Sequence, residues 1–284
     1  MKRILLAAFL ATAAISFSCT EKVEPDPHED DSLISGTTAT IEDFVIDGAA
    51  TKTTYQVNSD GNKITFQFTE SDVLRVYPSI HDYGTRFYAK TNTGNSWIFK
   101  ATGFKLVDGL SYSAFYPGTN REFAKQSIKV DYSDMSQKDL GSVDFLCAPD
   151  TKVENNACRF TMKHLSSLLP VKITLNEAAV ATELSLTSSD TPFILKGKVD
   201  LTANPVTITP EETTESVSLA LGDADSNGIS LDAGETTLFM LIAPVDMTGN
   251  TIHLELKNGD DVIVSSEIAG ENYKAGKAYI VEVE

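Results

Sequence analysis

Apolar and polar side chains alternate residue by residue over much of the chain after residue 37. The alternation is clear at 64–69, 171–175, 252–257 and 279–283. A period of two places the apolar side chains on one face of an extended strand, so these segments are predicted to be half-buried β-strands. The continuous apolar run at 238–242 is typical of a central strand, buried on both faces.

Turn-forming residues separate these segments. Asn258-Gly259 is the strongest hairpin signal, because both residues tolerate the positive φ angles of a tight turn. No window of a dozen residues has a convincing helical period, so little helix is expected. About seventeen short strands can be counted, more than one sandwich normally holds. The prediction is an all-β chain of two consecutive Greek-key β-sandwich domains, at 37–157 and 158–284, with the boundary near the polar stretch 149–156.

Residues 1–18 have the pattern of a secretory signal peptide. Lys2 and Arg3 precede an apolar run at 4–15 that is too short to span a bilayer of about 30 Å. Ser16-Phe17-Ser18-Cys19 comes next and is similar to a relaxed bacterial lipobox, which makes Cys19 the predicted lipidation site. The other interpretation is ordinary cleavage near Ser18, which would leave Cys19 as a free thiol.

Residues 19–36 are predicted to be a tether between this cysteine and the folded part. The segment is acidic, contains two prolines and buries little apolar area, so it is expected to stay extended. It is similar to the surface-export signals of Bacteroidetes lipoproteins; the other interpretation is a solvated spacer. Together with the lipid, it predicts an outer-membrane lipoprotein at the cell surface.

Charge and motif content exclude several classes of function. Asp and Glu total 40 against 23 Lys and Arg, and a net charge of −17 repels phosphate backbones, so no nucleic-acid partner is expected. The sequence has no motif of a serine nucleophile elbow, a zinc protease or a dithiol redox site. The segment 223–228 matches the first half of a calcium loop, but Gly234 stands where that loop needs a bidentate Glu. We therefore expect no catalysis, no metal and no cofactor.

Cys147 and Cys158 flank ten residues that are predicted to link two strands. Export would allow a disulfide between them, whose closed loop would contribute on the order of 3 kcal/mol. Both residues also suit small buried apolar positions, and the two interpretations stay open. Trp97 lies in an apolar run and is predicted to be a core residue rather than a sugar-stacking platform.

Several short motifs follow one another from Cys19 to Tyr279 in an order that resembles one protein family. Thr51-Lys52-Thr53 stands where that family has a T-R-T-like element, and Phe66 stands where it usually has Trp. The later matches are a Y-x-A-x-Y-P strand at 112–117, a D-x-M-x-A-like segment at 144–148, an F-x-x-x-H-x-x-S-x-L segment at 160–169, and late elements at 231–244 and 273–279. The family is the fimbrillins of Bacteroidetes type V pili.

This resemblance implies two β-sandwich domains of transthyretin-like topology. It also implies a role as a structural subunit, anchor or tip of a cell-surface pilus that supports adhesion. The implied partners are other pilus subunits, joined by donor-strand exchange after proteolysis, and the outer membrane that holds the lipid. The resemblance implies no enzyme activity and no cofactor.

Lys52 is the candidate site of proteolytic processing. It lies in the small and polar segment 48–53, which is predicted to be a mobile loop before the next strand. A cut there would detach the predicted strand at 38–46, in which a bulge at Glu42-Asp43 would keep the apolar side chains on one face. The groove left behind could accept a strand of a second subunit. In the other interpretation the strand stays in place, and the protein is an anchor or a solitary lipoprotein.

A surface lipoprotein that binds a glycan or a host protein without polymerising is the alternative function. Such a protein needs two or more aromatic side chains on one exposed surface. The candidate cluster, around the loop at 78–85, is Tyr77, Tyr83, Phe87 and Tyr88.

Overall fold

The computed structural model describes residues 34–46, 63–64, 66–94, 96–119, 124–155, 157–222 and 228–283. Strands dominate this part of the chain, and its one named helix is the 3₁₀ helix η2 (Gln137–Ser142). The all-β prediction is confirmed. Within the same ranges no helix has the length and apolar character needed to cross a membrane.

The first ten strands, in chain order, are β1 (Ile34–Ile41), β2 (Phe44–Ile46), β3 (Lys63–Ile64), β4 (Val73–Pro78), β5 (Thr85–Asn92), β6 (Trp97–Thr102), β7 (Ser111–Tyr116), β8 (Ile128–Asp131), β9 (Leu146–Lys152) and β10 (Cys158–His164). They are followed by β11 (Ser167–Leu175), β12 (Ala179–Ala181), β13 (Glu183–Thr187), β14 (Phe193–Val199), β15 (Ile208–Thr214), β16 (Ser216–Ala220) and β17 (Ile229–Leu231). The last are β18 (Gly234–Ile242), β19 (Val245–Asp246), β20 (Thr251–Asn258), β21 (Asp261–Ala269), β22 (Asn272–Tyr273), β23 (Lys277–Ala278) and β24 (Val281–Val283).

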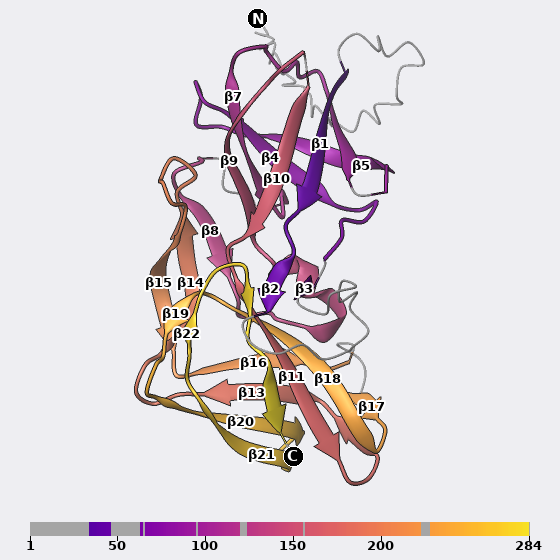
Figure 1. Cartoon of the computed structure of the whole chain (residues 1–284), viewed down its shortest axis with the longest axis vertical. Helices are drawn as coiled ribbons and strands as arrows, with labels where there is room; N and C mark the ends of the chain where they lie inside the picture. Colours follow the sequence, from indigo (N-terminus) through magenta and orange to yellow (C-terminus); the bar gives the residue numbers. More distant parts are fainter. Residues whose placement is uncertain are drawn as a thin grey trace, which may run out of the picture. The chain divides into compact units, whose positions relative to one another are not determined.

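Seven of these strands close into a barrel in the N-terminal part of the chain (Figure 1). Their order is β1-β10-β9-β7-β4-β5-β6, and β6 pairs with β1 again. Alternation along β6 points Trp97, Phe99 and Ala101 into the barrel core, where the Phe68 ring meets Phe99 edge to face at 5.1 Å. A closed barrel has no free edge, unlike the open sandwich predicted here. The finer prediction of two transthyretin-like sandwiches is therefore not confirmed.

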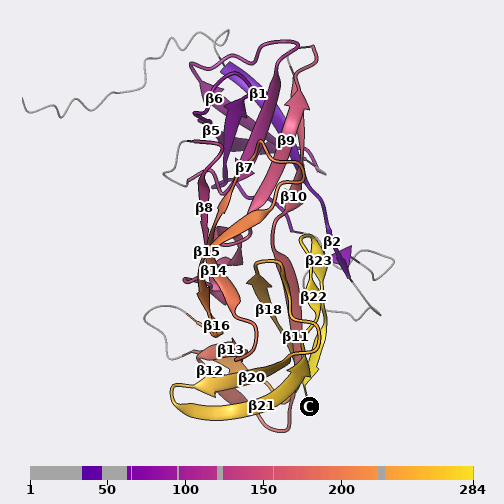
Figure 2. The same ribbon diagram turned by 90° about the vertical axis from the view of Figure 1, so that its left-hand side faces the viewer.

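The C-terminal part contains several smaller sheets around one core. Strands β18, β11, β23, β2 and β3 form one sheet, to which β24 adds along β11, and β16, β13, β20 and β21 form another. In Figure 2, β20 and β21 run across the lower end of the view, whereas β11 runs down beside them. Leu168 and Leu241 from the first sheet share an apolar core with Leu184 and Leu254 from the second. The remaining sheets are β15-β14-β8 and the pairs β12-β17 and β19-β22.

Most of the strands expected from the alternation are found, with two local differences. The run at 238–242 lies in β18 and is buried throughout, and Asn258-Gly259 makes the β20–β21 turn with φ of 60° at Gly259. Of the described residues in 64–69, in contrast, only Ile64 belongs to a strand, although Phe68 is buried in the barrel core. In the segment 171–175 of β11 the alternating Val171, Ile173 and Leu175 are buried and Thr174 is exposed, as predicted, but Lys172 on the polar face is buried as well.

Chain segments pass between the barrel and the C-terminal sheets in both directions. β8 comes between barrel strands in the sequence but pairs with β14, whereas β10 begins at the predicted domain boundary and pairs with β1 and β9 of the barrel. By its contacts, Leu33–Glu284 forms one compact unit. The boundary between 157 and 158 stays a prediction.

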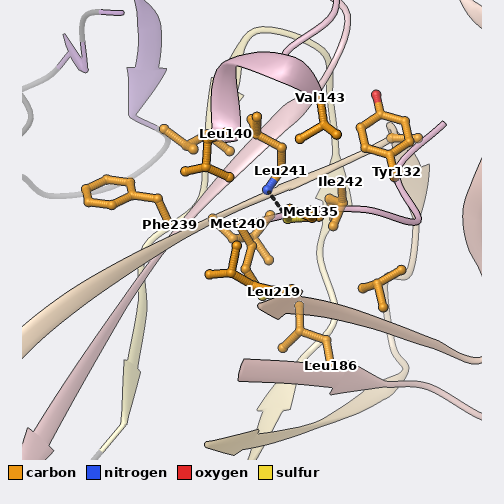
Figure 3. Packing of buried hydrophobic residues seen from close by; sticks show 14 of the residues in the cluster. Tyr132, Met135, Leu140, Val143, Leu186, Leu219, Phe239, Met240, Leu241 and Ile242 are labelled. Carbon is orange, nitrogen blue, oxygen red and sulfur yellow. Dashed lines mark hydrogen bonds between the residues drawn. The ribbon is translucent and has the colours of Figure 1, made fainter. Parts of the chain in front are cut away.

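The outer edge of β18 is covered by the segment that leads into η2. The Leu241 N–H donates a hydrogen bond to the Met135 sulfur at 3.4 Å, and the Phe239 N–H donates to Gln137 Oε1 at 3.2 Å. Figure 3 shows the Met135 sulfur at Leu241, with Leu140 and Val143 nearby. Side chains therefore satisfy backbone donors that a neighbouring strand would otherwise pair.

Candidate assembly site

Strand β1 closes the barrel by pairing with a strand on each side. Its residues Ile34–Ala39 pair antiparallel with β6, and Thr37–Ile41 pair parallel with β10. These partners lie far along the chain, since Thr37 pairs with Phe99 and with Cys158. Without β1, both β6 and β10 would present unpaired backbone groups.

Two of the β1 side chains that face the barrel core, those of Thr37 and Ala39, are small. Thr37 and Ala39 are buried, and Ile41 is partly buried beside the barrel core. The Thr37 hydroxyl donates a hydrogen bond of 2.7 Å to the Cys158 carbonyl oxygen. β1 is therefore held mainly by backbone pairing and contributes little apolar area of its own.

The chain leaves the barrel at Glu42-Asp43. The bulge predicted here, within one strand, is wrong: β1 ends at Ile41, and β2 pairs with β23 and β3 in another sheet. The Glu42 N–H still donates to the Met162 carbonyl at 2.8 Å, which marks the last barrel contact. Ala39 and Ile41 fall on odd positions and Phe44 and Ile46 on even positions, and this shift coincides with the move of the chain to another sheet.

A cavity of about 330 Å³ lies beside the last residues of β1. Ala39, Ile41 and Asp43 line it from the β1 side. Phe66, Phe68 and Trp97 are among the residues that line it from the rest of the barrel. Larger apolar side chains than those of β1 have room at this end of the strand.

The two predicted modification sites lie outside the described residues. Cys19 precedes β1, and Lys52 falls in the connection between β2 and β3. These two strands pair antiparallel, with Phe44 opposite Ile64. In the sequence, Lys52 therefore lies between β1 and β2, which precede it, and all the other strands, which follow it.

A comparison with protein-family models identifies the family of this chain. The sequence matches the family model described as fimbrillin-like over residues 34–284. The protein belongs to the fimbrillin-like family. None of the curated proteins matches this fimbrillin-like sequence.

Two solved structures are similar to this fimbrillin-like chain. A protein from Bacteroides ovatus ATCC 8483, described as a candidate cell adhesion protein, is 17% identical with a TM-score of 0.55, and the match covers 87% of this chain and 90% of that chain. Another, with the same description, from Bacteroides uniformis ATCC 8492, is 15% identical with a TM-score of 0.55, over 76% of this chain and 88% of that chain. At identities this low, the structural similarity establishes a shared fold alone.

Two motif residues of the fimbrillin-like chain meet where the barrel joins the C-terminal sheets. His164 Nδ1 lies 2.8 Å from Asp144 Oδ1, and both side chains are almost fully buried. The Phe66 ring packs edge-on against the imidazole at 5.9 Å. The motifs at 144–148 and 160–169 contained both residues, but nothing in their spacing showed that they would touch. This pair holds the segment before β9 against the end of β10, and next to it the Leu165 N–H donates a hydrogen bond to the Phe145 carbonyl.

The two described cysteines are both free and buried. Cys147 lies opposite Lys163 in the β9–β10 pair, five positions along β10 from Cys158. That offset corresponds to about 16 Å along a strand, beyond the reach of a disulfide. Burial raises the pKa of the Cys147 thiol to about 12 and that of Cys158 to about 11. The structure thus corrects the disulfide interpretation and gives both residues the role of small apolar side chains.

The aromatic cluster proposed for glycan binding is divided by the barrel wall. Tyr77 and Phe87 are buried, and only Tyr83 and Tyr88 are exposed. Trp97 lies in the barrel core, so that prediction is confirmed. Among the described residues no group of three or more His, Cys, Asp or Glu is arranged to hold a metal; most of the calcium-like segment 223–228 lies outside them.

Proposed function

We propose that this protein is a structural subunit, anchor or tip of a cell-surface pilus that supports adhesion. In this proposal it is attached to the outer membrane through a lipid on Cys19 and joins other subunits by strand exchange after cleavage at Lys52. The observation that supports it most is the position of β1, which closes the barrel and precedes Lys52 in the sequence.

Exchange of β1 for another strand is energetically reasonable. The incoming strand would restore the main-chain hydrogen bonds to β6 and β10, so the loss of β1 would be offset. It could also place a larger apolar side chain in the cavity beside Ala39 and Trp97. Burying one such side chain contributes about 2 kcal/mol, which β1 itself does not provide there.

Limited trypsin digestion of the folded precursor tests the proposed exchange. The protein would carry Cys19→Ala, so that it lacks the lipid and the extra thiol. We expect a new N-terminus at Thr53, release of the peptide that contains β1, and SDS-resistant ladders on gels. The Lys52→Gln variant should give neither the new terminus nor ladders.

A disulfide that locks β1 in place provides a matched control. Thr38 and Ile98 lie directly opposite each other in the antiparallel β1–β6 pair, where the Cα atoms are about 5 Å apart. With Thr38→Cys and Ile98→Cys oxidised, trypsin should still cut at Lys52 but ladders should appear only after reduction. Ladders from the oxidised protein, or cleavage that yields only monomers in every case, would contradict strand exchange and favour the solitary surface lipoprotein.

The lipid anchor is tested separately by cell fractionation. Cys19→Ala should move the protein from the membrane pellet to the soluble fraction, because no other attachment is proposed. If the variant remains in the pellet with the parent, the anchor assignment is wrong.

A further inference from the structure

Three long outer strands of the C-terminal sheets are protected against pairing with another chain. β18 is covered by Met135 and Gln137, and the last residue of β16 donates its N–H to the Met135 carbonyl at 2.9 Å. β15 carries Pro210, which lacks an N–H, and two glutamates next to it. Proline and charge on an outer strand are common means of preventing edge-to-edge association.

Within the described part of the chain β21 has neither a proline nor a covering segment, and its charged residues are Asp261 at its start and Glu267, which faces His253 of β20. It is nine residues long, contains no proline, and pairs with β20 alone. Val264 and Ile268 lie opposite Leu256 and Ile252 and are only partly buried against the core. The apolar face of this sheet therefore continues to its outermost strand and stays half open there.

We propose that β21 pairs antiparallel with β21 of a second copy of this chain, around a two-fold axis at Ser266. In this register Val264 faces Ile268 of the second copy, and the two Ser266 residues face each other. These pairs continue, across the two-fold axis, the apolar side chains that β20 and β21 place on the core face of the sheet. The two four-stranded sheets become one continuous sheet. The interface is isologous, because both copies contribute the same strand.

The occupant is a second copy because the strand is complementary to itself in this register, which pairs seven of its nine residues. On the outer face Glu267 meets Ser265 of the second copy, so no two carboxylates lie opposite each other. Moving the axis to Ser265 would place Glu267 opposite Ile263 and Val264 opposite Ser266. Of these two axes, the one at Ser266 matches apolar with apolar side chains and the Glu267 carboxylate with a hydroxyl, and it pairs more of the strand than an axis nearer Asp261 would.

This dimer is independent of the proposed strand exchange. β21 lies in a different sheet from β1 and requires no cleavage at Lys52. The net charge of −17 on each copy opposes association, so the dimer should be favoured by salt that screens this repulsion.

Cysteine cross-linking tests the register. In the Cys19→Ala background, Ser266→Cys should give a disulfide-linked dimer on mild oxidation in high salt, because the two Cα atoms would lie about 5 Å apart. Ser265→Cys is the matched control: Ser265 is more exposed, so random collision would favour it, but in the proposed register it faces Glu267. No cross-link at Ser266, or an equal yield at Ser265, would overturn the proposal.

Two lysine variants test the dimer without a covalent bond. Sedimentation velocity of the uncleaved Cys19→Ala protein over a concentration series in high salt should show a dimer. Ser266→Lys should abolish it, because two ammonium groups would face each other, whereas Ser265→Lys should preserve or strengthen it by facing Glu267 of the second copy. A monomeric parent, or equal association of both variants, would rule out this interface.

Discussion

At the residue scale, the contact between Asp144 and His164 shows how two motif residues act through burial. Both side chains are almost completely buried, and their 2.8 Å hydrogen bond joins the segment that precedes β9 to the last residue of β10. Ser166, two residues after His164, forms a second buried hydrogen bond of 2.9 Å with Tyr132. Polar groups this deeply buried are expensive to separate, because water cannot replace the lost partner.

We expect Asp144→Ala to lower the free energy of unfolding by about 2 to 4 kcal/mol, since it leaves the His164 side chain buried without its carboxylate partner. His164→Ala should have a similar cost, and the double variant should lose less than the sum of the two. Urea denaturation of all four proteins gives this coupling directly.

The exposed contact between His253 and Glu267, at 3.6 Å, is the control for that experiment. His253→Ala should leave the urea midpoint almost unchanged, because exposed ion pairs contribute little. Additive effects at Asp144 and His164 would show that their contact does not stabilise the fold.

At the element scale, the strands of the chain differ in how their edges are satisfied. β1 has partners on both sides, and its fully buried side chains, Thr37 and Ala39, are small, so its place is defined largely by the backbone. β18 has a partner on one side, and the side chains of Met135 and Gln137, from the segment after β8, complete the other. An unpaired backbone donor at a buried position costs about 1 to 3 kcal/mol, which explains why this edge is covered.

Met135→Leu tests the cover on β18. The substitution keeps most of the apolar volume but removes the sulfur that accepts from the Leu241 N–H. We expect a loss of about 1 kcal/mol and faster hydrogen exchange at the Leu241 amide. The Phe239 amide, which donates to Gln137, should exchange as before and serves as the internal control. Unchanged exchange at Leu241 would mean that the sulfur does not protect this edge.

At the scale of the whole molecule, the charge imbalance acts on stability. A net charge of −17 over 284 residues causes self-repulsion that the unfolded chain relieves by expanding. Sodium chloride should therefore raise the melting temperature by roughly 2 to 4 °C, equal to about 1 kcal/mol.

The shape of the salt dependence identifies the cause of this shift. Most of the rise should occur below about 0.2 M, where the Debye length falls from about 30 Å to about 8 Å. A steady rise that continues into the molar range would instead indicate a general effect of salt on apolar burial. A flat curve would contradict the role given to net charge.

The alternation of side chains was sufficient to predict the class of the fold and several of its local features. It identified β18 and β20, the turn at Asn258-Gly259 and the core position of Trp97. These are local properties, since the period of a strand and the φ angles of a turn depend on neighbouring residues. The order of motifs in the sequence likewise agreed with membership of the fimbrillin-like family.

The tertiary structure alone decided which strands meet. A period of two shows which side of a strand is buried, but every strand offers the same backbone donors and acceptors, so the partner is not encoded locally. That is why the closure of the barrel by β1, the move to another sheet after Glu42-Asp43 and the contact of Asp144 with His164 could not be predicted. It is also why Cys147 and Cys158, only eleven positions apart in the sequence, are too distant on their strands to be bridged.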